Sequence, residues 1–374
     1  MYMGREILLM SPLILYAGVR IGMFIRGTGM RILWALAFLC ICAGYPAAEA
    51  LENRVGSGLA MGLSIAGYIA LPFLLYLVLT GVATDIVFGL ARLTGILKKE
   101  TVKKPGYRRI RLALALLLPA AVVAFGAWNF NRMGVREYTV EIPRKSSKVG
   151  ELRIVFASDF HLQARTPDRI MEKFADKVNA LGADLVLIGG DIVEGGNSAD
   201  EKLAHEAAQF QRIKSTYGIF GVLGNHDSFG GDRASFFDKA GIRMLRDEYV
   251  RIDAAVYLAG RLDGRGRRGG PPRKSIDELL APVPEDLPII LIDHRPTDLE
   301  NLGRSRADLQ ISGHTHNAQI FPANFVARKE YELAWGYKKK GNAHLIVSTG
   351  VQGWGPPVRT AGASEIVLVR VLFK

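Results

Sequence analysis

The sequence predicts an all-α transmembrane region of about four helices followed by a layered α/β domain. Long uncharged apolar stretches fill residues 1–131, whereas residues 137–374 alternate short β-branched runs with helical patterns. The composition agrees, because 49% of the 374 residues are hydrophobic and the mean hydropathy is +0.14, which is too apolar for an ordinary soluble enzyme. The same composition excludes a disordered chain, a collagen-like repeat and a disulfide scaffold.

Four uncharged stretches are candidate membrane spans. They are Ile7–Val19, Ile32–Ala48, Val55–Thr84 and Leu112–Asn131. Because a span needs about 20 apolar residues, the third and fourth are long enough, the second needs its flanks, and the first requires that Arg20 be tolerated near its end. A cleavable signal peptide is the alternative interpretation of the first stretch, but basic residues follow it closely and a small-residue cleavage site does not.

The charge distribution predicts how the spans are oriented. Residues 1–130 carry 13 basic and 5 acidic side chains, and the loop at 92–111 carries eight basic side chains against Glu100. Short basic loops stay on the cytoplasmic side, so we expect a multi-pass protein of the cytoplasmic (inner) membrane with the second half of the chain on the extracytoplasmic side. We interpret loop 92–111 itself as facing solvent or lipid headgroups.

The second half alternates strand and helix patterns. Expected strands are Leu152–Ala157, Asp184–Ile188, Gly218–Leu223, Ala255–Ala259, Pro288–Ile292, Asp308–Ile311, His344–Ser348 and Ile366–Phe373. Expected helices are Pro167–Leu181, Ala199–Lys214, Arg233–Lys239, Ser275–Leu280 and Thr297–Leu302. This order is typical of a layered α/β architecture, and without an internal repeat the half is expected to be one domain.

Two further sequence features are a pair of cysteines and a Gly-, Pro- and Arg-rich run. Cys40 and Cys42 lie together in an apolar stretch, so they offer neither a disulfide framework nor a thiolate metal site. The run Gly264–Lys274 is rich in Gly, Pro and Arg, which predicts an exposed loop that could attract an anionic substrate or headgroup. Because it lacks interleaved aromatic residues, we expect no nucleic-acid partner.

Polar side chains follow five predicted strands at the point where each strand ends. The clusters are Asp159 with His161, Asp191, Asn225 with His226 and Asp227, His294, and His314 with His316. Strand ends in α/β folds meet at one edge of the sheet. Oxygen and imidazole donors suit Mn, Fe, Zn or Mg. Seven candidate ligands are too many for one ion with an open position, and they fit two ions about 3.5–4 Å apart with one bridging carboxylate. Such a positively charged centre suits a phosphate group.

These motifs, in this order and approximate spacing, resemble those of the calcineurin-like metallophosphoesterases, and the chain is similar to the membrane-attached bacterial branch of that family. The resemblance covers residues 137–374 and rests on Asp159-Phe160-His161, Gly190-Asp191, Gly224-Asn225-His226-Asp227, His294 and Gly313-His314-Thr315-His316. It implies a four-layer αββα sandwich.

The resemblance also implies a role for each site residue. Asp159, His161, Asp191 and His316 would bind one metal ion, and Asp191, Asn225, His294 and His314 would bind the second. A hydroxide bridging the two ions would attack phosphorus in line. His226 lies where the family places the residue that stabilises the transition state or protonates the leaving oxygen, and Asp227 is expected either to orient the His226 ring or to cap the following helix.

Other residues are expected near the substrate or in the framework. Asn317 and Arg295 depart from the residues common in the family at these positions, so we expect them to narrow the cleft or to contact the phosphate-bearing group. Trp335, Tyr337 and Trp354 are candidates for an apolar wall, with a packing role as the alternative. His205 and His344 are expected to be structural.

Together these residues predict a membrane-integral phosphoric ester hydrolase. Its substrate would be a phosphomonoester, phosphodiester or pyrophosphate, with a membrane phospholipid or lipid-linked phosphate as a candidate. One alternative is a cytoplasm-facing enzyme similar to the UDP-2,3-diacylglucosamine pyrophosphatases of lipid A synthesis, which the basic loop disfavours. The other is a non-catalytic membrane scaffold or sensor with a phosphatase-like domain, which the complete ligand set disfavours.

Overall fold

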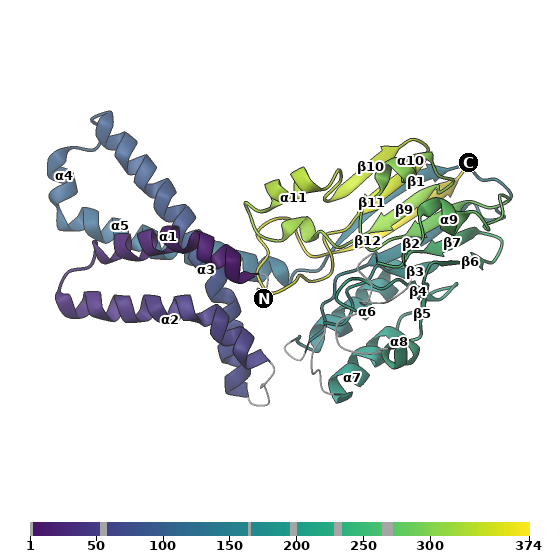
Figure 1. Cartoon of the computed structure of the whole chain (residues 1–374), viewed down its shortest axis with the longest axis horizontal. Coiled ribbons are helices and arrows are strands. Elements are labelled where there is room, and N and C mark those ends of the chain that lie inside the picture. Colours follow the sequence, from purple (N-terminus) through teal and green to yellow (C-terminus); the bar gives the residue numbers. More distant parts are fainter. Residues whose placement is uncertain (1–2, 53–57, 164–165, 195–199, 228–233, 264–271) are drawn as a thin grey trace. The chain divides into compact units, whose positions relative to one another are not determined.

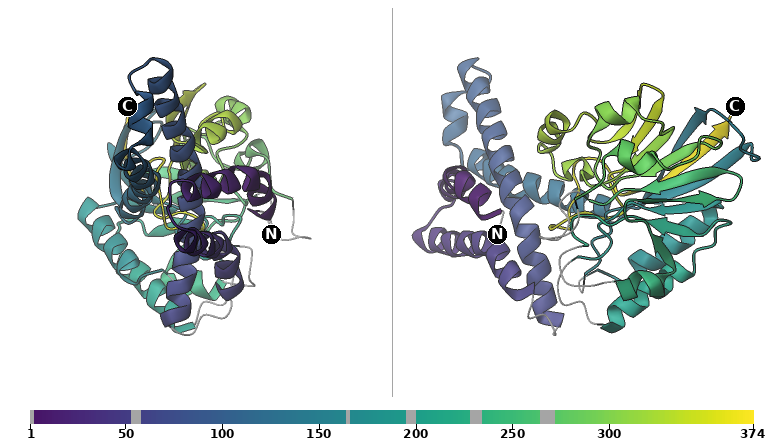
Figure 2. Two further views of the ribbon diagram at one scale, coloured as in Figure 1. Left: turned by 90° about the vertical axis from the view of Figure 1, so that its left-hand side faces the viewer. Right: turned by 45° about the vertical axis from the view of Figure 1, so that its right-hand side comes forward.

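A computed structural model describes residues 3–52, 58–163, 166–194, 200–227, 234–263 and 272–374 (Figure 1, Figure 2). The chain divides into two compact units. The first contains Met1–Trp128 with Gly355–Thr360, and the second contains Asn129–Trp354 with Ala361–Lys374. The sequence predicts an exposed loop at Gly264–Lys274. Residues 264–271 of this loop lie outside the described residues.

The first unit is built from helices. They are α1 (Met3–Gly22), α2 (Thr28–Glu52), α3 (Gly58–Leu93), the short α4 (Lys99–Lys103) and α5 (Pro105–Phe130). In the part of the chain that the structure describes, three helices are long and apolar enough to cross a membrane, at Thr28–Ala47, Met61–Leu93 and Pro105–Phe130. The first expected span forms a helix, α1, that is not among them, so the structure has three candidate spans where four were expected.

One acidic residue connects three of these helices. Asp85 of α3 accepts hydrogen bonds from Arg20 of α1 at 2.7 and 3.0 Å and forms an ion pair with Arg111 of α5. The guanidinium carbon of Arg111 also lies 4.4 Å from the centroid of the Phe88 ring. Ionisable residues in apolar helices are costly unless they are paired, so this cluster favours a single packing of α1, α3 and α5.

The second unit contains two six-stranded sheets. The strands are β1 (Gly134–Ile142), β2 (Glu151–Ala157), β3 (Leu185–Ile188), β4 (Ile219–Gly221), β5 (Ile242–Met244), β6 (Glu248–Ile252), β7 (Val256–Gly260), β8 (Ile289–Ile292), β9 (Leu309–Ser312), β10 (Gly336–Lys340), β11 (Ala343–Val347) and β12 (Glu365–Phe373). One sheet has the order β1-β12-β2-β3-β4-β5 and the other has the order β10-β11-β9-β8-β7-β6. Neighbouring strands β2, β3 and β4 are parallel, as are β7, β8 and β9.

Helices cover the outer face of each sheet, which gives four layers (Figure 1). The helices α6 (Arg169–Leu181), α7 (Asp200–Gln211) and α8 (Ala234–Ala240) pack on the first sheet, and α9 (Ile276–Leu280) and α10 (Leu299–Arg304) pack on the second. A short 3-10 helix, η1 (His316–Ala318), and α11 (Asn324–Glu330) follow β9.

Strand β2 shows why the layers form. Its Val155 and Ala157 are buried against the helices, whereas Ile154 and Phe156 are buried between the two sheets. A strand covered on both faces reads as a continuous apolar run, which is the pattern in the sequence. The predicted αββα sandwich, preceded by helices, is confirmed.

The expected elements of this unit all form, and each end lies within three residues of its expected position. The structure adds four strands that the sequence pattern did not reveal, β1, β5, β6 and β10. Each of them is the edge strand of its sheet. The central strands, which carry the site, are those that the sequence predicts.

Candidate metal centre

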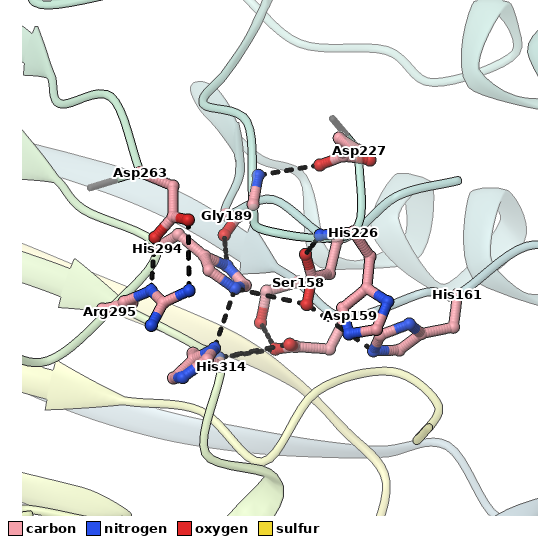
Figure 3. A network of polar contacts seen from close by, with 12 residues as sticks. Ser158, Asp159, His161, Gly189, His226, Asp227, Asp263, His294, Arg295 and His314 are labelled. Atoms are coloured by element: carbon pink, nitrogen blue, oxygen red, sulfur yellow. Dashed lines mark hydrogen bonds and ion pairs between the residues drawn. The ribbon is translucent and has the colours of Figure 1, made fainter. Parts of the chain in front are cut away.

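The polar clusters of the sequence meet at the carboxyl ends of strands from both sheets. Asp159 and His161 follow β2, Asp191 follows β3, Asn225 and His226 follow β4, His294 follows β8, and His314 and His316 follow β9. The side chains of Asp159, His161, His226, His294 and His314 lie close together (Figure 3). Asp159, His161, Asp191 and His294 are buried.

Glycines allow the loops of the site to approach one another. A Cβ on Gly190 would lie 2.6 Å from the Gly224 nitrogen, and a Cβ on Gly224 would lie 2.2 Å from a carboxylate oxygen of Asp191. Asp159 and Asp191 themselves have φ values of 57° and 51°. This left-handed conformation costs a non-glycine residue about 1–2 kcal/mol, and such residues cluster at functional sites because the surrounding structure must hold them there.

Asp159, His161 and His316 form the first group of donor atoms, all within 4.8 Å of one another. His316 Nε2 lies 3.6 Å from Asp159 Oδ1 and 3.2 Å from His161 Nε2. The Asp159 carboxylate is fixed by the Ser158 hydroxyl, which donates a hydrogen bond at 2.5 Å.

Asp191, His294 and His314 form the second group. His294 Nε2 lies 3.3 Å from Asp191 Oδ2 and 3.2 Å from His314 Nδ1. The same Asp191 oxygen lies 3.8 Å from His161 Nε2 of the first group. The other oxygen, Oδ1, accepts a hydrogen bond from the His226 backbone nitrogen at 2.8 Å. Asp191 therefore faces both groups of donors.

Two of the imidazoles are oriented by contacts at their outer nitrogens. His294 Nδ1 donates to the Gly189 carbonyl oxygen at 2.7 Å, which leaves Nε2 facing Asp191 and His314. His161 Nδ1 lies 2.6 Å from Glu194 Oε2, which leaves its Nε2 for the donor group. Metal-binding histidines in proteins are held by such contacts to carbonyl oxygens and carboxylates.

The electrostatics of the site favour positive charge. Burial by itself lowers the pKa of His294, but the charge of Asp191 raises it to about 10. Conversely, burial and the charge of His294 lower the pKa of His314 to about 2, so this imidazole is neutral, as a metal ligand must be. A proton on His294 thus occupies a position that a metal ion would take. The carboxylate and imidazole donors fit divalent metal ions.

Glu194 is a site residue that the motif analysis missed. Its carboxylate lies 2.6 Å from His161 Nδ1 and 2.7 Å from His226 Nδ1. Burial raises the pKa of Glu194, but the hydrogen bonds and charges of the two histidines lower it to about 2. An ionised carboxylate therefore holds both rings. Glu194 lies three residues after Asp191 in the segment that follows β3, and this position is the sequence feature that could have identified it.

The described hydrogen bonds of Asp227 are with backbone nitrogens of two loops. Its carboxylate accepts hydrogen bonds from the backbone nitrogens of Ile192, Val193 and Gly224, at 2.8, 3.0 and 2.8 Å (Figure 3). Among the described residues, the acidic side chain at the His226 ring is Glu194 and not Asp227. Asp227 thus ties the loop after β4 to the loop after β3.

The remaining expected residues have four different kinds of surroundings. Trp354, 40% exposed, has its ring centroid 6.0 Å from that of His226. Trp335 and Tyr337 instead hydrogen-bond to Glu365 and His344. His344 also contacts the Glu141 carbonyl oxygen, consistent with a structural role, and His205 of α7 lies 3.4 Å from Gln209. Arg295 forms an ion pair with Asp263, and Asn317 is buried.

Two stacked β-sheets covered by helices, with aspartates and histidines gathered at the strand ends, define a metallophosphoesterase domain. The family model of the calcineurin-like phosphoesterases matches residues 152–318, a range that contains every residue of both donor groups. The chain belongs to this family.

Relatives with this domain occur in several bacteria. A metallophosphoesterase of Helicobacter pylori is 33% identical over 228 residues, which make up 60% of this chain and 60% of that protein. One from Aquifex aeolicus is 33% identical over 246 residues, which make up 64% of this chain and 92% of that protein. A UDP-2,3-diacylglucosamine pyrophosphatase of Chlamydia trachomatis is 24% identical over 71% of this chain and 98% of its own length. The chain thus aligns with 60% of the length of the Helicobacter relative.

Proposed function

We propose that this chain is a membrane-integral metallophosphoesterase that hydrolyses a phosphomonoester, phosphodiester or pyrophosphate at a centre of two divalent metal ions. The observation that carries the proposal is the position of Asp191, whose Oδ2 lies 3.3 Å from His294 Nε2 and 3.8 Å from His161 Nε2. One carboxylate between two groups of donors is the arrangement that a dinuclear centre requires.

Each ion would have its own ligands. Asp159, His161, Asp191 and His316 would hold the first, and Asp191, Asn225, His294 and His314 would hold the second. Two bound divalent cations, whether Mn, Fe, Zn or Mg, would activate the attacking nucleophile and stabilise the charge that develops on the phosphoryl oxygens. Asn225 lies on the loop after β4, next to Gly224, whose close approach to Asp191 brings this loop to the site.

His226 and Glu194 would handle the leaving group. Glu194 contacts Nδ1 of the His226 ring at 2.7 Å, so Nε2 is left to hold a proton for the departing oxygen. The His226 side chain is partly exposed, as a group that contacts substrate must be. Trp354 beside it offers an apolar surface to the part of the substrate that leaves.

A membrane lipid or lipid-linked phosphate is the substrate class that the rest of the chain favours. Three helices long and apolar enough to span a bilayer would keep the catalytic domain at a membrane surface. A dissolved substrate needs no such tether, whereas a lipid substrate is confined to the same surface.

The test is metal-dependent hydrolysis by the purified full-length chain. Chelated protein reloaded with Mn²⁺ should bind two ions and cleave bis(p-nitrophenyl) phosphate or a lipid phosphate. Asp191→Asn should bind fewer than two ions and lower kcat by at least about 100-fold. Asp176→Asn, at an exposed position of α6, is the matched control. Metal binding without hydrolysis of any ester would support the sensor alternative instead.

A cytoplasm-facing UDP-2,3-diacylglucosamine pyrophosphatase is the second candidate. The observation in its favour is the similarity to the Chlamydia trachomatis enzyme over 98% of that protein's length. The discriminating assay offers UDP-2,3-diacylglucosamine and a phospholipid to the same Mn²⁺-loaded preparation. Preferential cleavage of the nucleotide-linked lipid would support this candidate over the first.

A further inference from the structure

A cavity of about 510 Å³ lies inside the helical unit, between the α1–α2 connection, α2 and α5. Its volume is within the range of about 300–1,000 Å³ that is typical of ligand sites. All of its lining residues belong to residues 24–37 and 105–116, so it is separate from the metal centre in the second unit.

One end of this cavity carries uncompensated positive charge. Arg26, Arg108 and Arg109 line it, and the described lining contains no carboxylate. In the described part of the chain, Arg108 donates a hydrogen bond to the Met23 carbonyl oxygen at 3.2 Å. Among the described residues, none of the three arginines forms an ion pair.

The neighbouring charges increase this excess. Phe24 lines the cavity, and the guanidinium carbons of Arg20 and Arg111 lie 4.9 and 5.2 Å from its ring centroid. These two arginines share the single carboxylate of Asp85. Asp85 therefore offsets one of their two charges and leaves nothing for the arginines that line the cavity.

The rest of the cavity is apolar. Leu33 of α2 and Leu112 and Leu116 of α5 belong to its lining. Leu116 lies eight residues beyond Arg108, which is about 12 Å along a helix axis. Trp34 forms a fixed wall, because its Nε1 donates to the Gly18 carbonyl oxygen of α1 at 2.8 Å. The charged end is thus followed by an apolar trough about as long as part of an acyl chain.

We propose that this cavity binds an anionic glycerophospholipid, with its phosphate at Arg26, Arg108 and Arg109 and an acyl chain along Leu33, Leu112 and Leu116. Arginine donates paired hydrogen bonds to phosphate oxygens. A free phosphate ion would leave the apolar lining uncovered. A zwitterionic lipid would bring a second cation beside the arginines, and a lipid without a phosphate would bring no counter-charge. The inference rests on the proposed membrane insertion of α2 and α5, and it is independent of the proposed hydrolysis.

The test measures lipid binding to the chelated full-length chain, in which hydrolysis is silent. Native mass spectrometry of detergent-purified protein titrated with phosphatidylglycerol or phosphatidylcholine gives an apparent Kd for each lipid. We expect the wild-type chain to prefer phosphatidylglycerol by at least about tenfold. Equal retention of the two lipids by the wild-type chain would overturn the proposal, whatever the variants do.

Matched variants locate the site. Changing Arg26, Arg108 and Arg109 to Gln should abolish the preference, whereas Lys98→Gln with Lys99→Gln and Lys103→Gln removes the same charge from exposed positions outside the cavity and should change the Kd by less than about twofold. Equal losses in both triple variants would show diffuse surface attraction and overturn the site.

Two further measurements separate the ligand sources. Leu33→Asn should also weaken phosphatidylglycerol binding, since the proposal places the acyl chain there. Millimolar inorganic phosphate should fail to displace the lipid. Full displacement by phosphate together with an unaffected Leu33→Asn variant would reassign the cavity to a free anion. Mn²⁺-dependent diester hydrolysis by the variants reports that the catalytic domain is intact.

Discussion

Glu194 contacts two imidazoles at once, one from a residue of the first donor group and one from the residue assigned to the leaving group. Glu194→Gln keeps the size of this side chain and removes its charge. We expect metal affinity and kcat each to fall about 10- to 100-fold, as for other residues that orient metal-binding histidines. Steady-state kinetics at saturating Mn²⁺ separate the two effects, and Glu201→Gln, exposed on α7, is the control.

An unchanged kcat at saturating metal would show that Glu194 acts on His161 alone. Both values unchanged would remove Glu194 from the site. Restoration of activity in Glu194→Asp at higher Mn²⁺ would support an orienting role, because the shorter carboxylate keeps the charge.

Site residues that carry donor atoms and belong to a sequence motif could be predicted. Residues whose role depends only on tertiary contacts were harder to predict. Asp159, His161, Asp191, His294, His314 and His316 follow apolar strands and carry donor atoms, so the sequence identifies them. Glu194 follows the same strand as Asp191 but carries no motif that would distinguish it from a surface glutamate. For Asp227, the sequence could not decide between orienting the His226 ring and capping the following helix. In the structure its carboxylate accepts three backbone hydrogen bonds.

At the scale of the elements, the turn after β4 must pass against Asp191. A Cβ on Gly224 would lie 2.2 Å from the Asp191 carboxylate. Gly224→Ala should therefore displace the shared aspartate and lower kcat by at least about 100-fold, while the domain stays folded. Circular dichroism and Mn²⁺-dependent hydrolysis measure the two properties. Gly150→Ala, where a Cβ would meet open space, should leave both unchanged.

Helix α7 buries a carboxylate at a stability cost that depends on pH. Burial raises the pKa of Glu206 from its ordinary value of 4.5 to about 7, although Lys202 lies 3.4 Å away. The folded chain then holds this proton more tightly than the unfolded chain. The free energy of unfolding is therefore unaffected below pH 4.5 and falls as the pH rises to 7, by about 3 kcal/mol at most.

Glu206→Gln should remove this dependence. We expect the variant to be more stable than the wild-type chain at pH 8, by about 1–3 kcal/mol, and close to it at pH 4.5. Thermal unfolding of the chelated protein at several pH values measures this, because chelation excludes effects of metal binding. A constant difference between the two proteins at every pH would contradict the assignment.

Edge strands explain most of what the sequence pattern left out of the fold. The central strands β2, β3 and β8 contain continuous apolar runs because both of their faces are covered. The four missed strands lie at the sheet edges, and each contains charged residues that interrupt an apolar run, as do the three lysines of β10. Such edges also discourage pairing with other chains.

For the whole molecule, we propose that the second unit lies on the extracytoplasmic side of the membrane, because loop 92–111 is basic and short basic loops stay in the cytoplasm. This placement depends only on the loop and on α5, so it is the same whether three or four helices span the membrane. A reporter active only outside the cytoplasm, fused after Lys374, should be active, and a reporter active only in the cytoplasm should not. The reverse result would place the metal centre in the cytoplasm and favour the nucleotide-linked substrate.

The strand β12 lies between β1 and β2, parallel to the first and antiparallel to the second. It is also the last strand in chain order. A ribosome therefore produces β1 and β2 more than 200 residues before the strand that joins them. Until residues 365–373 have been translated, the first sheet has a gap next to β2 and β1 has no partner. The nascent chain must keep these backbone groups from pairing with other polypeptides, so assembly of this sheet is completed late in synthesis.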